Sequence, residues 1–158
     1  MGNYLFEQLA FVRGQTLKFM QGVSEDEGNR IPEGFRNHIR WQLGHIYTVT
    51  ERFAFYFAGL PMVLPDGFSE QFGNGTSPET PTNYPVPTLQ ELETLLQEQL
   101  HRIQTTLPER VHQTIDPPYV TSAGMRLGSI EEFLTFNLYH EGMHISMIKV
   151  YKKLVAGK

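Results

Sequence analysis

The chain has 158 residues, of which 40% are hydrophobic and 12% aromatic, so we expect one folded domain over residues 1–158 with a sizeable core. Its net charge of -4 argues against nucleic acid as the main partner. We expect no membrane-spanning segment, because no apolar run reaches about 18 residues, and no signal peptide, because the first residues lack a basic and then apolar pattern. The absence of cysteine excludes disulfides, thiolate ligands and a cysteine nucleophile, and it fits a cytoplasmic protein.

Two amphipathic helices are predicted in the first third of the chain. Residues 4–23 carry apolar side chains at a helical period, and Gly22 suits the end of this helix. Residues 35–58 repeat the pattern, which stops at Gly59 and Pro61. The short link between the two helices predicts that they are antiparallel neighbours.

Glycine and proline are concentrated in residues 60–87. Because Phe68, Phe72 and Tyr84 can anchor this segment, we predict a structured loop rather than a flexible linker. A connection of this length can cross a bundle from end to end and leave the helices on either side parallel. Long loops are often functional, so this one is a candidate pocket wall, the alternative being a plain surface crossover.

The second half of the chain holds two further predicted helices. Residues 88–107 form the third, with Thr88 as N-cap and Glu91 at capping-box spacing. Residues 130–155 form the fourth, with Ser129 as N-cap.

Residues 109–128 are predicted to be an irregular connection with a short hairpin around Pro117. Four amphipathic helices without convincing strands predict an all-α fold, a four-helix bundle with a long crossover loop between the second and third helices.

His140 and His144 lie four residues apart in an apolar, helix-periodic run. Residues at this spacing are neighbours on a helix, with Cβ atoms about 5–6 Å apart. Two imidazoles so placed can share one metal ion, at N–Zn distances of about 2.0–2.1 Å. The alternative is that both are ordinary core or surface histidines.

A third protein ligand has to come from upstream, because residues 145–158 contain no His, Asp or Glu. His45 is the best candidate, since it lies mid-helix in the apolar pattern and Gly44 beside it leaves space for another helix, a metal or a ligand. His38 is the rival, but it lies about 10 Å from His45 along the helix axis, so the two cannot readily reach one ion. Two further histidines are expected at the surface: His101 and His112.

The segment from His140 to His144 also matches the H-E-x-x-H motif of zinc proteases. In such proteases a third ligand normally lies downstream, which this chain lacks, so we disfavour a protease. Glu141 is a candidate general base, the alternative being a surface residue one step off the ligand face. Three further residues are candidates to orient the imidazoles, or else simple core residues: Tyr47, Asn137 and Tyr139.

Three segments resemble the DinB-like, or YfiT-like, superfamily of bacterial metal-binding bundles, which is distinct from the DNA polymerase of that name. They are Trp-Gln-Leu-Gly-His ending at His45, Phe-Gly-x-Gly-Thr-Ser-Pro over residues 72–78, and the pair His140 and His144. Their order and spacing carry the resemblance across essentially the whole chain. The resemblance implies an up-down-down-up four-helix bundle, a divalent ion, zinc or nickel in many members, held by His45 and the pair, and a homodimer.

Characterised relatives of this kind include thiol S-transferases that use bacillithiol, mycothiol or glutathione, and maleylpyruvate isomerases. Three imidazoles leave a fourth metal position open, as in catalytic zinc sites. Because the chain has no cysteine, a sulfur nucleophile would come from the substrate. We therefore expect a metal-dependent enzyme that joins a small-molecule thiol to an electrophilic substrate. The alternatives are a non-catalytic, stress-associated metal-binding bundle, a metal-dependent hydrolase, and a dimerising bundle without metal.

Overall fold

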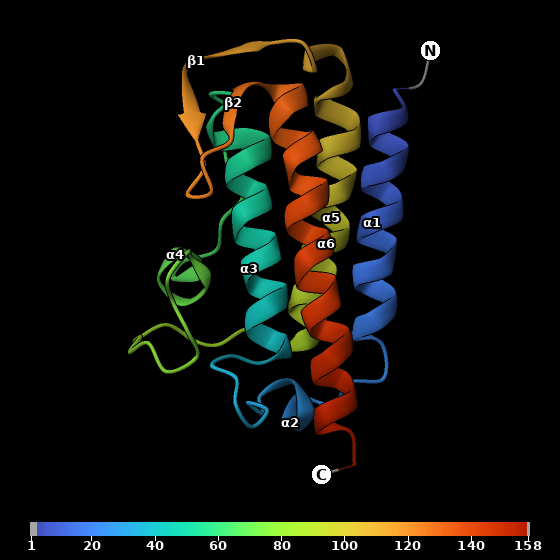
Figure 1. Ribbon diagram of the computed structural model, residues 1–158, viewed down its shortest axis with the longest axis vertical. Coiled ribbons are helices and arrows are strands. Elements are labelled where there is room, and N and C mark those ends of the chain that lie inside the picture. Colours follow the sequence, from blue (N-terminus) through green and yellow to red (C-terminus); the bar gives the residue numbers. More distant parts are fainter. Residues whose placement is uncertain (1–2, 158) are drawn as a thin grey trace.

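The computed structural model describes residues 3–157, and its four long helices lie side by side (Figure 1). They are α1 (Tyr4–Met20), α3 (Ile39–Glu51), α5 (Leu89–Thr106) and α6 (Ile130–Val155). In the view of Figure 1, α1 and α6 descend while α3 and α5 ascend. The shorter elements are α2 (Glu25–Gly28), the π-helical turn η1 (Arg52–Tyr56), α4 (Phe68–Phe72), the 3-10 turn η2 (Pro108–Arg110) and the strands β1 (Thr114–Val120) and β2 (Arg126–Ser129).

The boundaries of α5 and α6 follow the predicted caps. The Thr88 hydroxyl accepts the N–H of Glu91, and the Glu91 carboxylate accepts the N–H of Thr88, which confirms the capping box. At α6 the Ser129 hydroxyl accepts the N–H of Glu132. Glu132 itself bonds the N–H of Gly128, outside the helix, so only half of a capping box forms there.

Helix α3 is shorter at both ends than the predicted helix over residues 35–58. It begins at Ile39 because Nδ1 of His38 accepts the N–H of Trp41 and caps the first turn. At its other end the chain widens into the π-helical turn η1. Such turns often occur at functional sites, and Phe53 in this turn lies with its ring centroid 6.2 Å from that of His140.

The short helices α2 and α4 and the strands β1 and β2 correct the fold predicted from the sequence. Residues 24–34 and 60–87, predicted as a turn and a loop, contain α2 and α4. The expected hairpin is present, but β1 and β2 pair antiparallel with Tyr119 opposite Leu127, so the turn lies well beyond Pro117. The protein is therefore mostly helical with a two-stranded sheet, rather than free of strands. Within residues 3–157, no helix has the length and apolar character needed to cross a membrane.

Buried polar side chains divide the core along the helix axes. One apolar cluster lies towards the hairpin and includes Leu9, Phe53, Ile103 and Phe133. A second lies towards α2 and includes Met20, Leu43, Leu92 and Tyr151. In the sequence of every long helix, buried polar residues fall between the members of the two clusters. We call this set the polar layer; it comprises Arg13, Thr16, Thr48, Thr50, Glu51, Gln99, Asn137 and Glu141.

Candidate metal centre

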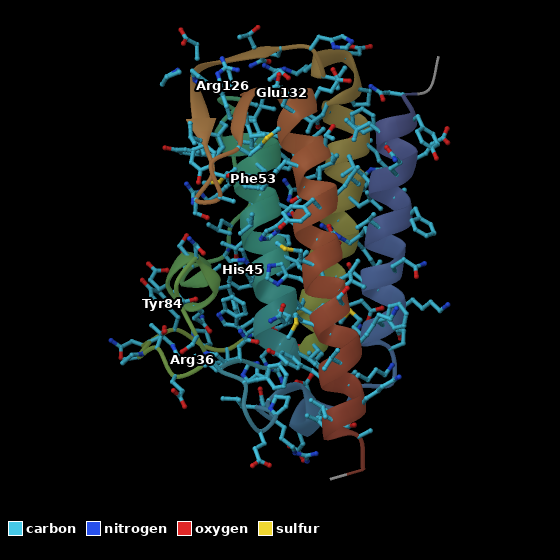
Figure 2. All side chains as sticks on the ribbon, viewed as in Figure 1. Arg36, His45, Phe53, Tyr84, Arg126 and Glu132 are labelled. Atoms are coloured by element: carbon cyan, nitrogen blue, oxygen red, sulfur yellow. The ribbon has the colours of Figure 1, made fainter. Side chains whose placement is uncertain are left out.

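Three histidines meet between α3 and α6, midway along both helices. Nε2 of His140 lies 3.2 Å from Nε2 of His45 and 3.2 Å from Nε2 of His144. One ring nitrogen from each residue lies within 4.8 Å of the other two. The helical spacing places the two α6 imidazoles on one face, and this face meets α3 at His45, which Figure 2 labels.

Two of the three imidazoles are fixed through their other ring nitrogen. Nδ1 of His45 donates to the carbonyl oxygen of Phe72 at 2.7 Å, and Nδ1 of His144 donates to Oε1 of Gln42. With the proton on Nδ1, Nε2 of each ring presents a lone pair to the shared centre. His140 differs, because its Nδ1 is buried and has no hydrogen-bond partner among residues 3–157.

The crossover loop between η1 and α5 shapes the surroundings of His45. The ring of Phe72 fills the space that a side chain on Gly44 would need, since a Cβ there would lie 2.4 Å from the ring. Trp41 stacks on His45 with ring centroids 4.6 Å apart, and its indole N–H donates to the Thr76 hydroxyl. Two of the three segments that carry the sequence resemblance, residues 41–45 and 72–78, therefore pack on each other and together orient this imidazole.

Burial keeps all three imidazoles neutral at pH 7. Burial, together with charge on the neighbouring His144 and His45, lowers the pKa of His140 to about 3. Burial and His45 together lower the pKa of His144 to about 4. Burial also lowers the pKa of His45, although its bond to Phe72 opposes the shift. Since neutral imidazole is the form that binds metals, the three rings are available as ligands at neutral pH.

The spacing of the nitrogens fits a tetrahedral divalent ion. N–metal distances of about 2.0–2.1 Å and tetrahedral angles require ligand nitrogens about 3.3–3.4 Å apart. The two Nε2 pairs at 3.2 Å come close to this value. Among residues 3–157, the group contains these three histidines and no carboxylate. His45 is buried while His140 and His144 are partly exposed, so the arrangement suits three protein ligands and one exchangeable position.

Glu141, the candidate general base, lies elsewhere. Its Oε1 accepts hydrogen bonds from Nε of Arg13 at 2.8 Å and from the hydroxyl of Thr16 at 2.7 Å, both on α1. The residue is 2% exposed, so its interpretation as a surface residue is wrong. The structure brings Glu141 to α1 and not to the three imidazoles.

The groups that orient the imidazoles are not the ones predicted. This function falls to Gln42 and to the backbone carbonyl of Phe72. Gln42 had a sequence signal, because it lies three residues before His45 and so shares a side of the helix with it. A carbonyl from a distant loop leaves no such signal. The three predicted candidates are engaged elsewhere or exposed: Asn137 accepts from Thr50, Tyr47 donates to the carbonyl of Val63, and Tyr139 is exposed.

The remaining histidines lie outside the group. His38 caps α3 through Nδ1. His101 and His112 are exposed, as the sequence predicts, and His112 pairs with Glu131 at the surface.

Comparison with known proteins finds a family and a solved structure that resemble this chain over most of its length. The model of the DinB superfamily matches residues 8–148. The crystal structure of a conserved protein from Enterococcus faecalis is similar, with a TM-score of 0.66 and 15% identity, over 98% of this chain and 96% of that one. No curated protein matches the chain. Because the family match covers most of the sequence, the chain belongs to the DinB superfamily.

Proposed function

We propose that the protein binds one divalent metal ion, zinc or nickel, through Nε2 of His45, His140 and His144. The observation that carries this proposal is the pair of 3.2 Å separations between Nε2 atoms, close to the edge of a metal-centred tetrahedron. Imidazole ligands suit both metals. The ion would join α3 to α6, and we infer that the four long helices form an up-down-down-up bundle, which the directions in Figure 1 support.

Metal analysis of protein purified without a His-tag tests this proposal. We expect about one zinc or nickel ion per chain in the wild type and almost none in His45→Ala, because two imidazoles alone hold an ion weakly. His38→Ala is the matched control on the same helix and should retain the metal. Retention by His45→Ala together with loss by His38→Ala would contradict the assignment.

We propose further that the metal-loaded protein is an enzyme that transfers a low-molecular-weight thiol to an electrophilic carbon. When bound, the ion would act as a Lewis acid that lowers the pKa of a thiol towards neutral pH. In the reaction the S–H proton passes to solvent, an S–C bond forms, and the leaving group departs with the electron pair of the broken bond. Two observations support this proposal: the chain has no cysteine of its own, and two of the three histidines, His140 and His144, are partly exposed.

Within this proposal, the residues around the histidines have two tasks. Gln42 and the carbonyl of Phe72 hold two imidazoles in the tautomer that presents Nε2. Trp41 and Phe53 supply apolar walls beside His45 and His140, which exclude water from one side of the centre.

Loss of free thiol measures the proposed activity. Metal-loaded protein is incubated with bacillithiol, mycothiol or glutathione and a broad panel of electrophiles. We expect at least one combination to lose thiol faster than the uncatalysed blank, and His45→Ala to match the blank. Stoichiometric metal binding without thiol loss in any combination would contradict the transferase and favour a non-catalytic metal-binding module.

A further inference from the structure

The ion pair between Arg13 and Glu141 has no part in the metal centre described above, although Glu141 directly follows His140. Nε and Nη2 of Arg13 bond the two carboxylate oxygens at 2.8 and 3.2 Å. Both residues are 2% exposed. A fully desolvated ion pair contributes little net stability in general, so its presence beside the candidate ligands calls for another explanation.

This ion pair continues into a network that joins all four long helices. Nη1 of Arg13 donates to the carbonyl of Leu96 at 2.7 Å, and Nη2 donates to Oε1 of Gln99 at 3.0 Å. Nε2 of Gln99 donates to Glu51 at 3.1 Å, and Glu51 pairs with Arg102. Two carboxylates therefore face two guanidinium groups, and their charges balance, with Arg102 at the partly exposed edge of the polar layer.

His140 is the imidazole that most needs such support. The rings of His45 and His144 are each held by a hydrogen bond at Nδ1. Nδ1 of His140 has no partner among the described residues. The position of its Nε2 is therefore set by the placement of α6 itself.

A small rotation of α6 would be enough to break the centre. Side-chain atoms lie about 5–6 Å from a helix axis, so a rotation of about 20° moves them by about 2 Å. Metal–ligand distances tolerate deviations of only about 0.2 Å. Apolar packing alone does not specify rotation this closely, since hydrophobic cores readily repack with other side chains at similar stability. A buried charge, in contrast, is costly unless its hydrogen bonds are made, so this ion pair restricts the rotations open to α6.

We propose, on the basis of the metal site proposed above, that Arg13 and Glu141 are positioning residues that fix the rotation of α6 and so hold His140 and His144 at the shared centre. They act through the backbone of α6 and touch neither metal nor substrate. The glutamate of the H-E-x-x-H match thus serves the site from an adjacent side of α6, about 100° around the helix from His140, where it anchors α6 to α1.

Cobalt(II) titration separates this positioning effect from a general effect on stability. Glu141→Gln keeps the shape of the side chain and removes its charge. The double variant Arg13→Met with Glu141→Leu removes both charges together, so neither is left unpaired and the protein remains folded. Glu25→Gln is the matched control, because it breaks the ion pair of another buried arginine, Arg40, away from α6.

We expect both Glu141 variants to bind Co(II) about 10–100-fold more weakly than wild type, as is usual when outer-shell support of a ligand is lost. Their visible Co(II) spectra at saturation should also differ from that of wild type, while urea denaturation of the double variant shows no matching loss of stability. Glu25→Gln should bind Co(II) with wild-type affinity.

Wild-type affinity and an unchanged spectrum in the folded double variant would overturn the positioning role and leave the ion pair purely structural. Failure of the wild-type protein to bind Co(II) would instead contradict the metal site itself, so the two proposals fail in different ways.

Discussion

His38 and His45 lie on the same side of one helix, but they have different partners. Nδ1 of His38 accepts the N–H of Trp41 at the start of α3, whereas Nδ1 of His45 donates to the crossover loop. Only a neutral imidazole can accept at Nδ1, and burial lowers the pKa of His38 to about 4. His38 is therefore a neutral N-cap at pH 7.

This cap should make stability depend on pH. The pKa of His38 is lower in the folded state than in the unfolded chain, where it is about 6.5. As the pH decreases below about 6.5, the unfolded chain binds the proton before the folded protein does. The free energy of unfolding therefore decreases by up to about 1.4 kcal/mol per pH unit, until about pH 4. His38→Asn keeps an N-cap acceptor that does not titrate. Urea denaturation of metal-free protein should show a shallower acid decline for this variant; parallel pH profiles would contradict the prediction.

Single residues were predictable from the sequence where spacing alone decides their place. The i, i+4 pair on α6 and the mid-helix position of His45 are of this kind. The cap function of His38 was not predicted, because histidine is not among the preferred N-caps. The burial of Glu141 was also missed, since its partner Arg13 lies on a distant helix and an isolated charge normally indicates a surface position.

At the scale of elements, the crossover loop packs closely on α3 at Gly44. A Cβ on Gly44 would lie 2.4 Å from the buried ring of Phe72, whose carbonyl also holds His45. Gly44→Ala should therefore displace this loop, lower the free energy of unfolding by about 1–3 kcal/mol and weaken metal binding. Chemical denaturation and metal titration measure the two effects.

The same substitution at Gly142 is the control, and its expected effect on stability is the opposite. It lies in α6 between the two metal-binding candidates, and a Cβ there would meet no atom within 4 Å. Gly142→Ala should stabilise the protein by about 0.5–1 kcal/mol, because alanine is the better helix former. If both alanine variants had the same effect on stability, close packing at Gly44 would not be the reason for its glycine.

The sequence predicted best those helices that are long and begin with a recognisable N-cap. Helices α5 and α6 carry long apolar periods with recognisable N-caps, so their boundaries were predicted almost to the residue. Helices α2 and α4 are too short to show a period. The π-helical turn η1 was missed because its five residues continue the apolar pattern of α3; it packs against α6, and its Phe53 contacts Tyr119 of β1.

At the scale of the whole molecule, the short link predicted that α1 and α3 are antiparallel, and the length of the crossover allowed α3 and α5 to be parallel, whereas the full up-down-down-up order came from the family resemblance. The long segment over residues 60–87 leaves α3 and α5 running the same way (Figure 1). The polar layer was not predicted, since it requires knowing which polar residues of four helices meet at one level. The homodimer and the cytoplasmic location stay predictions. An exposed apolar stripe on α6 is available to a partner: Tyr139, Met143, Val150 and Leu154.

The polar layer also constrains how this protein can diverge. Within either apolar cluster, one hydrophobic residue can replace another of similar size with little loss of stability. In the layer between them, a lone replacement of Arg13 or Glu141 leaves an uncompensated charge in the interior. Sequence changes in the two apolar clusters should therefore accumulate one residue at a time, whereas Arg13 and Glu141 should change together.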